Sequence, residues 1–100
     1  MFGFGRPNVE KLEGKRDVAG LTRVLASAPQ VELRTRALHA LVRLEQQDPV
    51  LGALGDGAAE VRAEAAHALG ESRELRAELP LVLALRDHDW QVRTAAAGTP

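Results

Sequence analysis

The chain has 100 residues, with 13 Lys and Arg against 14 Asp and Glu, so its formal net charge is −1. This near balance argues against a dedicated nucleic-acid binder, which would carry a basic excess. There is no Cys, which excludes disulfides and thiolate metal sites. Ala and Leu dominate the 45% of hydrophobic residues and Ile is missing, so the composition predicts an all-helical protein.

Capping residues and breakers divide the first half into three helices. The first is predicted to begin after Asn8, an N-cap candidate, and to end at Gly14. Asp17 is expected to cap the second helix, which Ala28-Pro29-Gln30 breaks. The third helix is predicted over 31–46.

The next two helices are defined by proline and glycine. Asp48-Pro49 predicts the N-cap and first residue of a short helix that ends at 55–57. The following helix is expected over 58–69, with Gly70 as the left-handed residue after its end.

The last two helices are separated by an acidic turn. A helix is predicted to begin within 73–78, with Pro80 in its first turn or at a kink, and to end at 87–89. Trp90 then opens the final helix. We expect Trp90 to pack on its neighbour; the alternative is an interface anchor, a role in which Trp is enriched.

Three similar segments lie on these helices: ELRTRALHAL at 32–41, EVRAEAAHAL at 60–69 and QVRTAAAGTP at 91–100. A period of about 30 residues fits one helix–turn–helix unit. The sequence therefore predicts one domain, 1–100. It consists of an N-terminal cap over 1–16 and helix pairs over 17–47, 48–72 and 73–100, the last of them truncated.

The second helix of each pair has one apolar stripe. Its expected core residues are Leu33, Ala37 and Leu41 in the first pair, and Val61, Ala65 and Leu69 in the next.

An arginine recurs inside this stripe, as Arg34, Arg62 and Arg93, and a partly buried arginine needs hydrogen-bonding partners. We expect these arginines to form a ladder that ties successive turns to Asp56 and Asp87. Within it, Arg62 is expected to link to Asp56 across its own turn, whereas no Asp stands opposite Arg34. Anion binding is the functional alternative.

The opposite side of the same helices is predicted to be exposed and to bind a partner. The candidate residues are Thr35, Arg36, His39, Arg43, Glu64, His67 and Glu71. His39 and His67 occupy the same repeat position, but no third ligand recurs beside them, so we expect no metal site. Arg36 and Arg43 face Glu64 and Glu71 one repeat on, which predicts either inter-repeat ion pairs or a groove with a basic half and an acidic half.

Both ends of the stack need cover. Phe2 and Phe4 are expected to cover the open end of the first pair. The final helix has no following repeat, so its apolar edge of Val92, Ala96 and Ala97 is expected to fray or to pair with another chain.

The segments EVRAEAAHALG and ALRDHDWQVRTAAA resemble the HEAT-repeat family, in particular the bacterial and archaeal HEAT-like repeats also seen in phycobilin-lyase-type proteins. The opening RPNVEKLEGKRDVAGLTRVL is similar to the start of small prokaryotic members. The resemblance implies a right-handed α-solenoid of about three antiparallel helix pairs behind a cap helix. It also implies that the second helices line the concave face, and that the protein is a scaffold for other macromolecules.

No enzyme site is recognisable, because the chain has no Gly-rich phosphate loop, no Cys and no Tyr. We therefore expect a non-catalytic, cytoplasmic scaffold that binds another protein, with no cofactor, no metal and no membrane segment. The resemblance leaves two alternatives open: a tetrapyrrole-binding or lyase-like accessory protein, and a nucleic-acid-binding module.

Overall fold

A computed structural model describes residues 7–98, and all regular structure within them is helical. The elements are α1 (Val9–Gly14), α2 (Val18–Ser27), α3 (Val31–Arg43), α4 (Gln47–Gly52), the 3₁₀ turn η1 (Ala53–Gly55), α5 (Ala59–Ser72), the 3₁₀ turn η2 (Leu75–Ala77), α6 (Glu78–Ala84) and α7 (Trp90–Ala97). Phe2 and Phe4 lie outside the described residues.

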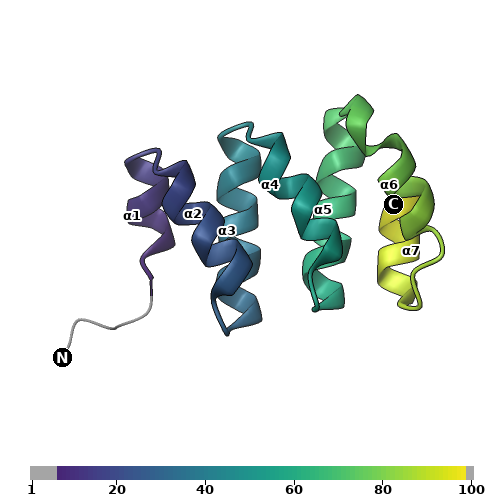
Figure 1. Cartoon of the computed structure of the whole chain (residues 1–100), viewed down its shortest axis with the longest axis horizontal. Coiled ribbons are helices and arrows are strands. Elements are labelled where there is room, and N and C mark those ends of the chain that lie inside the picture. Colours follow the sequence, from purple (N-terminus) through teal and green to yellow (C-terminus); the bar gives the residue numbers. More distant parts are fainter. Residues whose placement is uncertain (1–6, 99–100) are drawn as a thin grey trace.

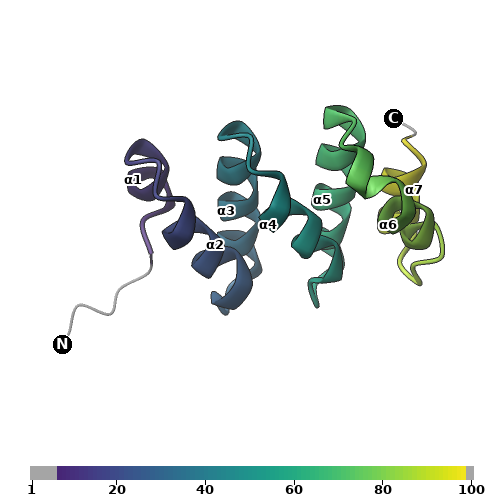
Figure 2. The same ribbon diagram turned by 45° about the horizontal axis from the view of Figure 1, so that its top comes forward.

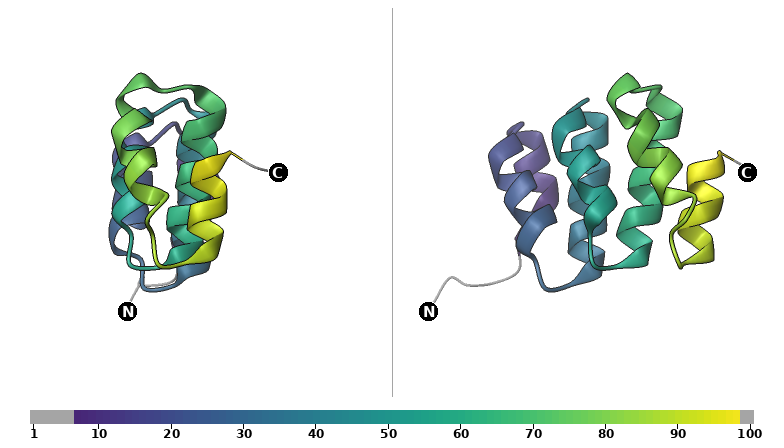
Figure 3. Two further views of the ribbon diagram at one scale, coloured as in Figure 1. Left: turned by 90° about the vertical axis from the view of Figure 1, so that its right-hand side faces the viewer. Right: turned by 45° about the vertical axis from the view of Figure 1, so that its right-hand side comes forward.

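The helices form antiparallel pairs that follow one another along a single axis, behind the short helix α1 (Figures 1 and 2). Seen down that axis, α2, α4 and α6 form one layer and α3, α5 and α7 the other (Figure 3). We call these the A layer and the B layer. The molecule is elongated, 44 × 24 × 20 Å. The predicted all-helical solenoid of about three pairs is therefore confirmed.

Side-chain caps begin the first two helices, as predicted. The Lys11 N–H donates to Asn8 Oδ1, and the Gly20 N–H donates to Asp17 Oδ1, both at 2.9 Å. A Cβ at position 20 would lie 2.7 Å from the Asp17 carboxylate, so a side chain at this buried position would push the capping carboxylate away from its place.

The predicted core stripe is buried in both complete B-layer helices. It comprises Leu33, Ala37 and Leu41 in α3, and Val61, Ala65 and Leu69 in α5. In α7, Val92 is also buried, because α7 packs along α5. Val92 therefore does not belong to the uncovered apolar edge that was expected for the final helix, while fraying of this helix or its pairing with another chain stays a prediction.

Two B-layer helices end at other residues than predicted, because charged residues adopt the left-handed conformation after them; for α5, Gly70 was expected in that role. α3 stops at Arg43 because Glu45 has φ 60°, and the Gln46 N–H donates back to Leu41 O at 2.9 Å. α5 runs through Gly70 to Ser72 and ends at Arg73, which has φ 57°.

Pro49 and Pro80 lie in the first turns of the A-layer helices α4 and α6, where backbone N–H groups have no partner within the helix. α4 begins at Gln47, so Asp48 and Pro49 follow its first residue. Asp48 is not a cap: its Oδ1 accepts a hydrogen bond from Arg76 Nη1 at 2.6 Å. Pro80 lies in the first turn of α6, as predicted.

Candidate functional site

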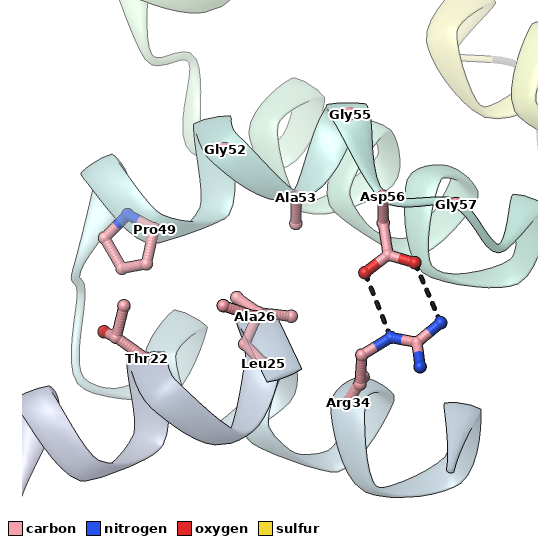
Figure 4. Close-up of a pocket in the computed structure, with 10 residues that line it drawn as sticks. All are labelled: Thr22, Leu25, Ala26, Arg34, Pro49, Gly52, Ala53, Gly55, Asp56 and Gly57. Carbon is pink, nitrogen blue, oxygen red and sulfur yellow. Dashed lines mark hydrogen bonds and ion pairs between the residues drawn. The ribbon is translucent and has the colours of Figure 1, made fainter. Parts of the chain in front are cut away.

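Arg34 and Arg62 each bind both carboxylate oxygens of an aspartate in the next helix pair. Arg34 donates from Nε and Nη2 to Asp56 at 3.1 Å each, beside the groove drawn in Figure 4. Arg62 donates in the same way to Asp87, at 2.9 and 3.2 Å. Each Nη1 binds a backbone oxygen in the preceding turn, Ala28 O for Arg34 at 2.9 Å and Asp56 O for Arg62 at 2.8 Å. Each arginine therefore ties its own turn to the next pair.

This register differs by one repeat from the expected one. The carboxylate of Asp56 binds Arg34, which has no Asp in its own turn, and Arg62 takes only the backbone oxygen of Asp56. The reason is reach: Nη1 folds back to the turn while the Nε–Nη2 edge points across to the next pair. Arg93 forms the bond to its own turn, since its Nη1 donates to Asp87 O at 2.7 Å. Within residues 7–98 it binds no aspartate side chain.

The bound arginine affects the titration of its partner. The hydrogen bonds from Arg62 lower the pKa of Asp87, and the Asp89 N–H adds to this effect. In return, Asp87 raises the pKa of Arg62. We interpret the two pairs as structural, because each guanidinium bonds both its aspartate and its own turn.

The groove of about 450 Å³ in Figure 4 lies between α2 and the α4–η1 segment, within the A layer. Its charged residues are Arg34 and Asp56, and these bond to each other. Gly52, Gly55 and Gly57 leave the space open, but they add no side chain that could recognise a ligand. This groove therefore offers a ligand little specific chemistry.

A second groove, of about 410 Å³, lies between α3 and α5 on the exposed side of the B layer. It brings together five of the seven predicted partner-binding residues, together with the apolar Val42 and Ala68. The five are His39, Arg43, Glu64, His67 and Glu71. Across the groove, His39 Nε2 lies 3.0 Å from Glu64 Oε1. We call this the B-layer groove.

The arginines of this face pair with the cap helix and not with the acids of the next repeat. Arg43 donates from Nε and Nη2 to the carboxylate of Glu13 at 2.7 Å each, and Arg36 bonds Glu10. Arg43 thereby lowers the pKa of Glu13, and Arg36 lowers that of Glu10. The expected pairing with Glu64 and Glu71 is wrong because α1 also packs against α3 and presents its own acids, Glu10 and Glu13, to these arginines.

The remaining candidate, Thr35, turns inward. Its Oγ1 is buried and bonds no atom within residues 7–98. Thr35 therefore lies beside the predicted surface and contributes little to it.

Neither a metal nor a membrane site was found in the described part of the chain. Within residues 7–98 no group of three or more His, Asp or Glu side chains could hold a metal ion. The helices described there are also too short and too polar to cross a membrane.

The structure thus consists of successive helix pairs in two layers. In two of these pairs an arginine binds the aspartate of the next pair. A family model described as HEAT repeats matches residues 18–99. The chain belongs to the HEAT-repeat family. Neither a curated protein nor a solved structure matches it. HEAT repeats generally mediate protein–protein interaction and are typically non-enzymatic scaffolds; the prokaryotic subtype stays a prediction.

One feature of this HEAT-repeat chain was missed in the sequence. Trp90 is 64% exposed, so the expectation that it packs on a neighbour is wrong. Leu79, Val82 and Leu83 of α6 are also exposed. The exposure of α6 could have been predicted by aligning Asp87 with Asp56. In that alignment Leu79 and Leu83 match Asp48 and Gly52 of α4, which are not apolar core residues.

Proposed function

We propose that this HEAT-repeat chain is a scaffold that binds a protein partner in the B-layer groove. The observation that carries the proposal is that five residues chosen for their repeat positions line one groove. HEAT repeats generally act through protein–protein contacts. An extended helical surface of this kind needs no reactive group.

The groove favours a partner segment with an aliphatic side chain next to a basic one. Val42 and Ala68 pack against the core and supply apolar walls. Glu71 is exposed and forms no hydrogen bond or ion pair within residues 7–98. A Lys or Arg of the partner would therefore pair with Glu71, while its aliphatic neighbour lies between Val42 and Ala68.

The charge of this face supports a protein ligand over a nucleic acid. Arg36 and Arg43, its arginines in α3, are bonded to Glu10 and Glu13. Phosphate binding depends on basic side chains that are free to displace counterions. These two arginines would first have to leave their carboxylates.

Quantitative affinity capture from the native host tests the proposal with a charge-reversed variant, Glu71→Lys. Glu78→Lys is the matched control, because Glu78 is also exposed but lies on α6 in the A layer. We expect a specific partner to be retained by the wild type and by Glu78→Lys, and lost with Glu71→Lys. A partner retained by Glu71→Lys and lost with Glu78→Lys would place the site in the A layer and overturn the proposal.

A further inference from the structure

We propose that the partner segment bound in the B-layer groove is an extended peptide with a positively charged side chain on each side of an aliphatic one. The inference rests on the proposed function and specifies the conformation and the charges of the occupant. It follows from a second hollow, of about 250 Å³, which continues the B-layer groove to the turn between α3 and α4. We call this second space the turn hollow.

The B-layer groove and the turn hollow are adjoining parts of one channel. Val42, Ala68 and Ser72 line both of them, so an occupant that passes these three residues leaves one hollow and enters the other. The α3–α4 turn and the end of α5 lie at the same end of the helices (Figure 1). The channel therefore runs along α3 and α5 toward that end, within the middle of the stack.

The turn hollow is polar and has two side chains available for binding. It is lined by Glu45, Gln46 and Gln47. Gln46 Nε2 donates to Leu44 O at 3.2 Å, whereas the side chains of Glu45 and Gln47 form no hydrogen bond or ion pair within residues 7–98. Among the described residues, the turn hollow thus offers an occupant one carboxylate and one amide.

The carboxylates of the channel select a partner with two cations. Glu71 in the B-layer groove and Glu45 in the turn hollow are both exposed, and neither is bonded within residues 7–98. Of the nearby arginines, Arg43 binds Glu13, and Arg73 at the end of α5 lines neither hollow. Each of the two carboxylates therefore favours a Lys or Arg of the partner.

The apolar part of the channel lies between these two charges. Val42 and Ala68 line both hollows, while Glu71 lines only the B-layer groove and Glu45 only the turn hollow. Val42 and Ala68 also pack against the core, which fixes their positions. An aliphatic side chain of the partner would lie on them, with one cation on either side.

The amide of Gln47 favours an extended backbone over a helical one. Gln47 is half-buried, and its side chain can donate and accept hydrogen bonds at the same time. An extended segment presents backbone N–H and C=O groups along its length, whereas a helix has already paired most of its own. An extended occupant therefore supplies both kinds of partner for Gln47.

Selection of phage-displayed random short peptides on the full chain tests the proposal, because it presupposes neither the partner nor the spacing of its charges. We expect the enriched peptides to share two basic residues that flank an aliphatic one. Their Kd values, measured by fluorescence anisotropy on synthetic peptides with capped ends, should rise about two- to fivefold with Glu45→Gln and about three- to tenfold with Gln47→Met. Glu78→Gln is the matched control, since Glu78 is exposed on α6 in the A layer, and it should leave Kd unchanged.

Two changes to the peptide complete the test. Alanine in place of one of the two basic residues should abolish the effect of Glu45→Gln, because the ion pair then has only one member. A lactam bridge that holds the same peptide helical should weaken binding about tenfold or more.

Enriched peptides with a single cation, whose binding ignores Glu45→Gln and Gln47→Met, would overturn the proposal and leave the B-layer groove as a docking site. Tighter binding of the helical form, or a selection that enriches no peptide, would also overturn it. Affinity capture with Glu71→Lys tests the docking site itself, so failure of the proposed function is distinguishable from failure of this inference.

Discussion

Replacement of Arg62 by Ala should lower the free energy of unfolding by about 2–3 kcal/mol. Arg62 donates two hydrogen bonds to Asp87 and one each to the carbonyl oxygens of Asp56 and Gly57. The side chains of Arg62 and Asp87 are only 12% and 14% exposed, so water replaces these bonds poorly.

The size of the effect follows from what remains after the change. Loss of one partner from a buried ion pair costs about 3–5 kcal/mol, since the other charge is left uncompensated. Here the Asp89 N–H still donates to Asp87 at 2.9 Å and the pair is not fully buried, so we expect a smaller loss.

Arg93→Ala is the matched control, because Arg93 occupies the same repeat position and forms one bond, to Asp87 O. It should cost less than about 1 kcal/mol. Denaturant unfolding followed by far-UV circular dichroism measures both variants, and Arg62→Ala should lower the thermal midpoint by about 10–20 °C. If both variants lost the same free energy of unfolding, the bond between Arg62 and Asp87 would not be what stabilises the contact between these helix pairs.

Two further predictions concern the acidic partners. Because Arg62 lowers the pKa of Asp87 in the folded state, the resulting stabilisation is present above the unfolded-state pKa of about 3.9 and is lost as the pH falls through the folded-state value. Urea unfolding at several pH values should therefore show the stability gap between wild type and Asp87→Asn closing below about pH 4, and a constant gap would contradict this. Arg43→Gln removes both hydrogen bonds to Glu13 and should speed amide hydrogen exchange in α1 while leaving α5 unchanged. Unaltered exchange in α1 would show that this pair does not hold the cap helix.

The features predictable from the sequence are those set by local chemistry. The caps Asn8 and Asp17 act within three residues, and Pro80 restricts the first turn of its own helix. The core stripe follows from helical periodicity, which is why Leu33 and Val61 were assigned to the buried side.

The features that could not be predicted depend on which segments become neighbours. Arg34 and Arg62 were recognised as ladder residues, but a repeat motif does not say whether an arginine reaches its own turn or the next. Arg43 binds Glu13 in α1, thirty residues earlier, because the cap helix lies beside α3. The helix end at Arg73 needs a left-handed non-glycine residue, which residue preferences disfavour.

Site-specific photo-crosslinking in the native host can show whether a protein binds in the B-layer groove. A photoreactive amino acid replaces His67 in the groove, or Arg23 on the exposed side of α2 as the control. We predict that one partner is cross-linked from position 67 and not from position 23, and that Glu71→Lys suppresses the cross-link. A partner cross-linked from position 23 and not from position 67 would contradict binding in the B-layer groove.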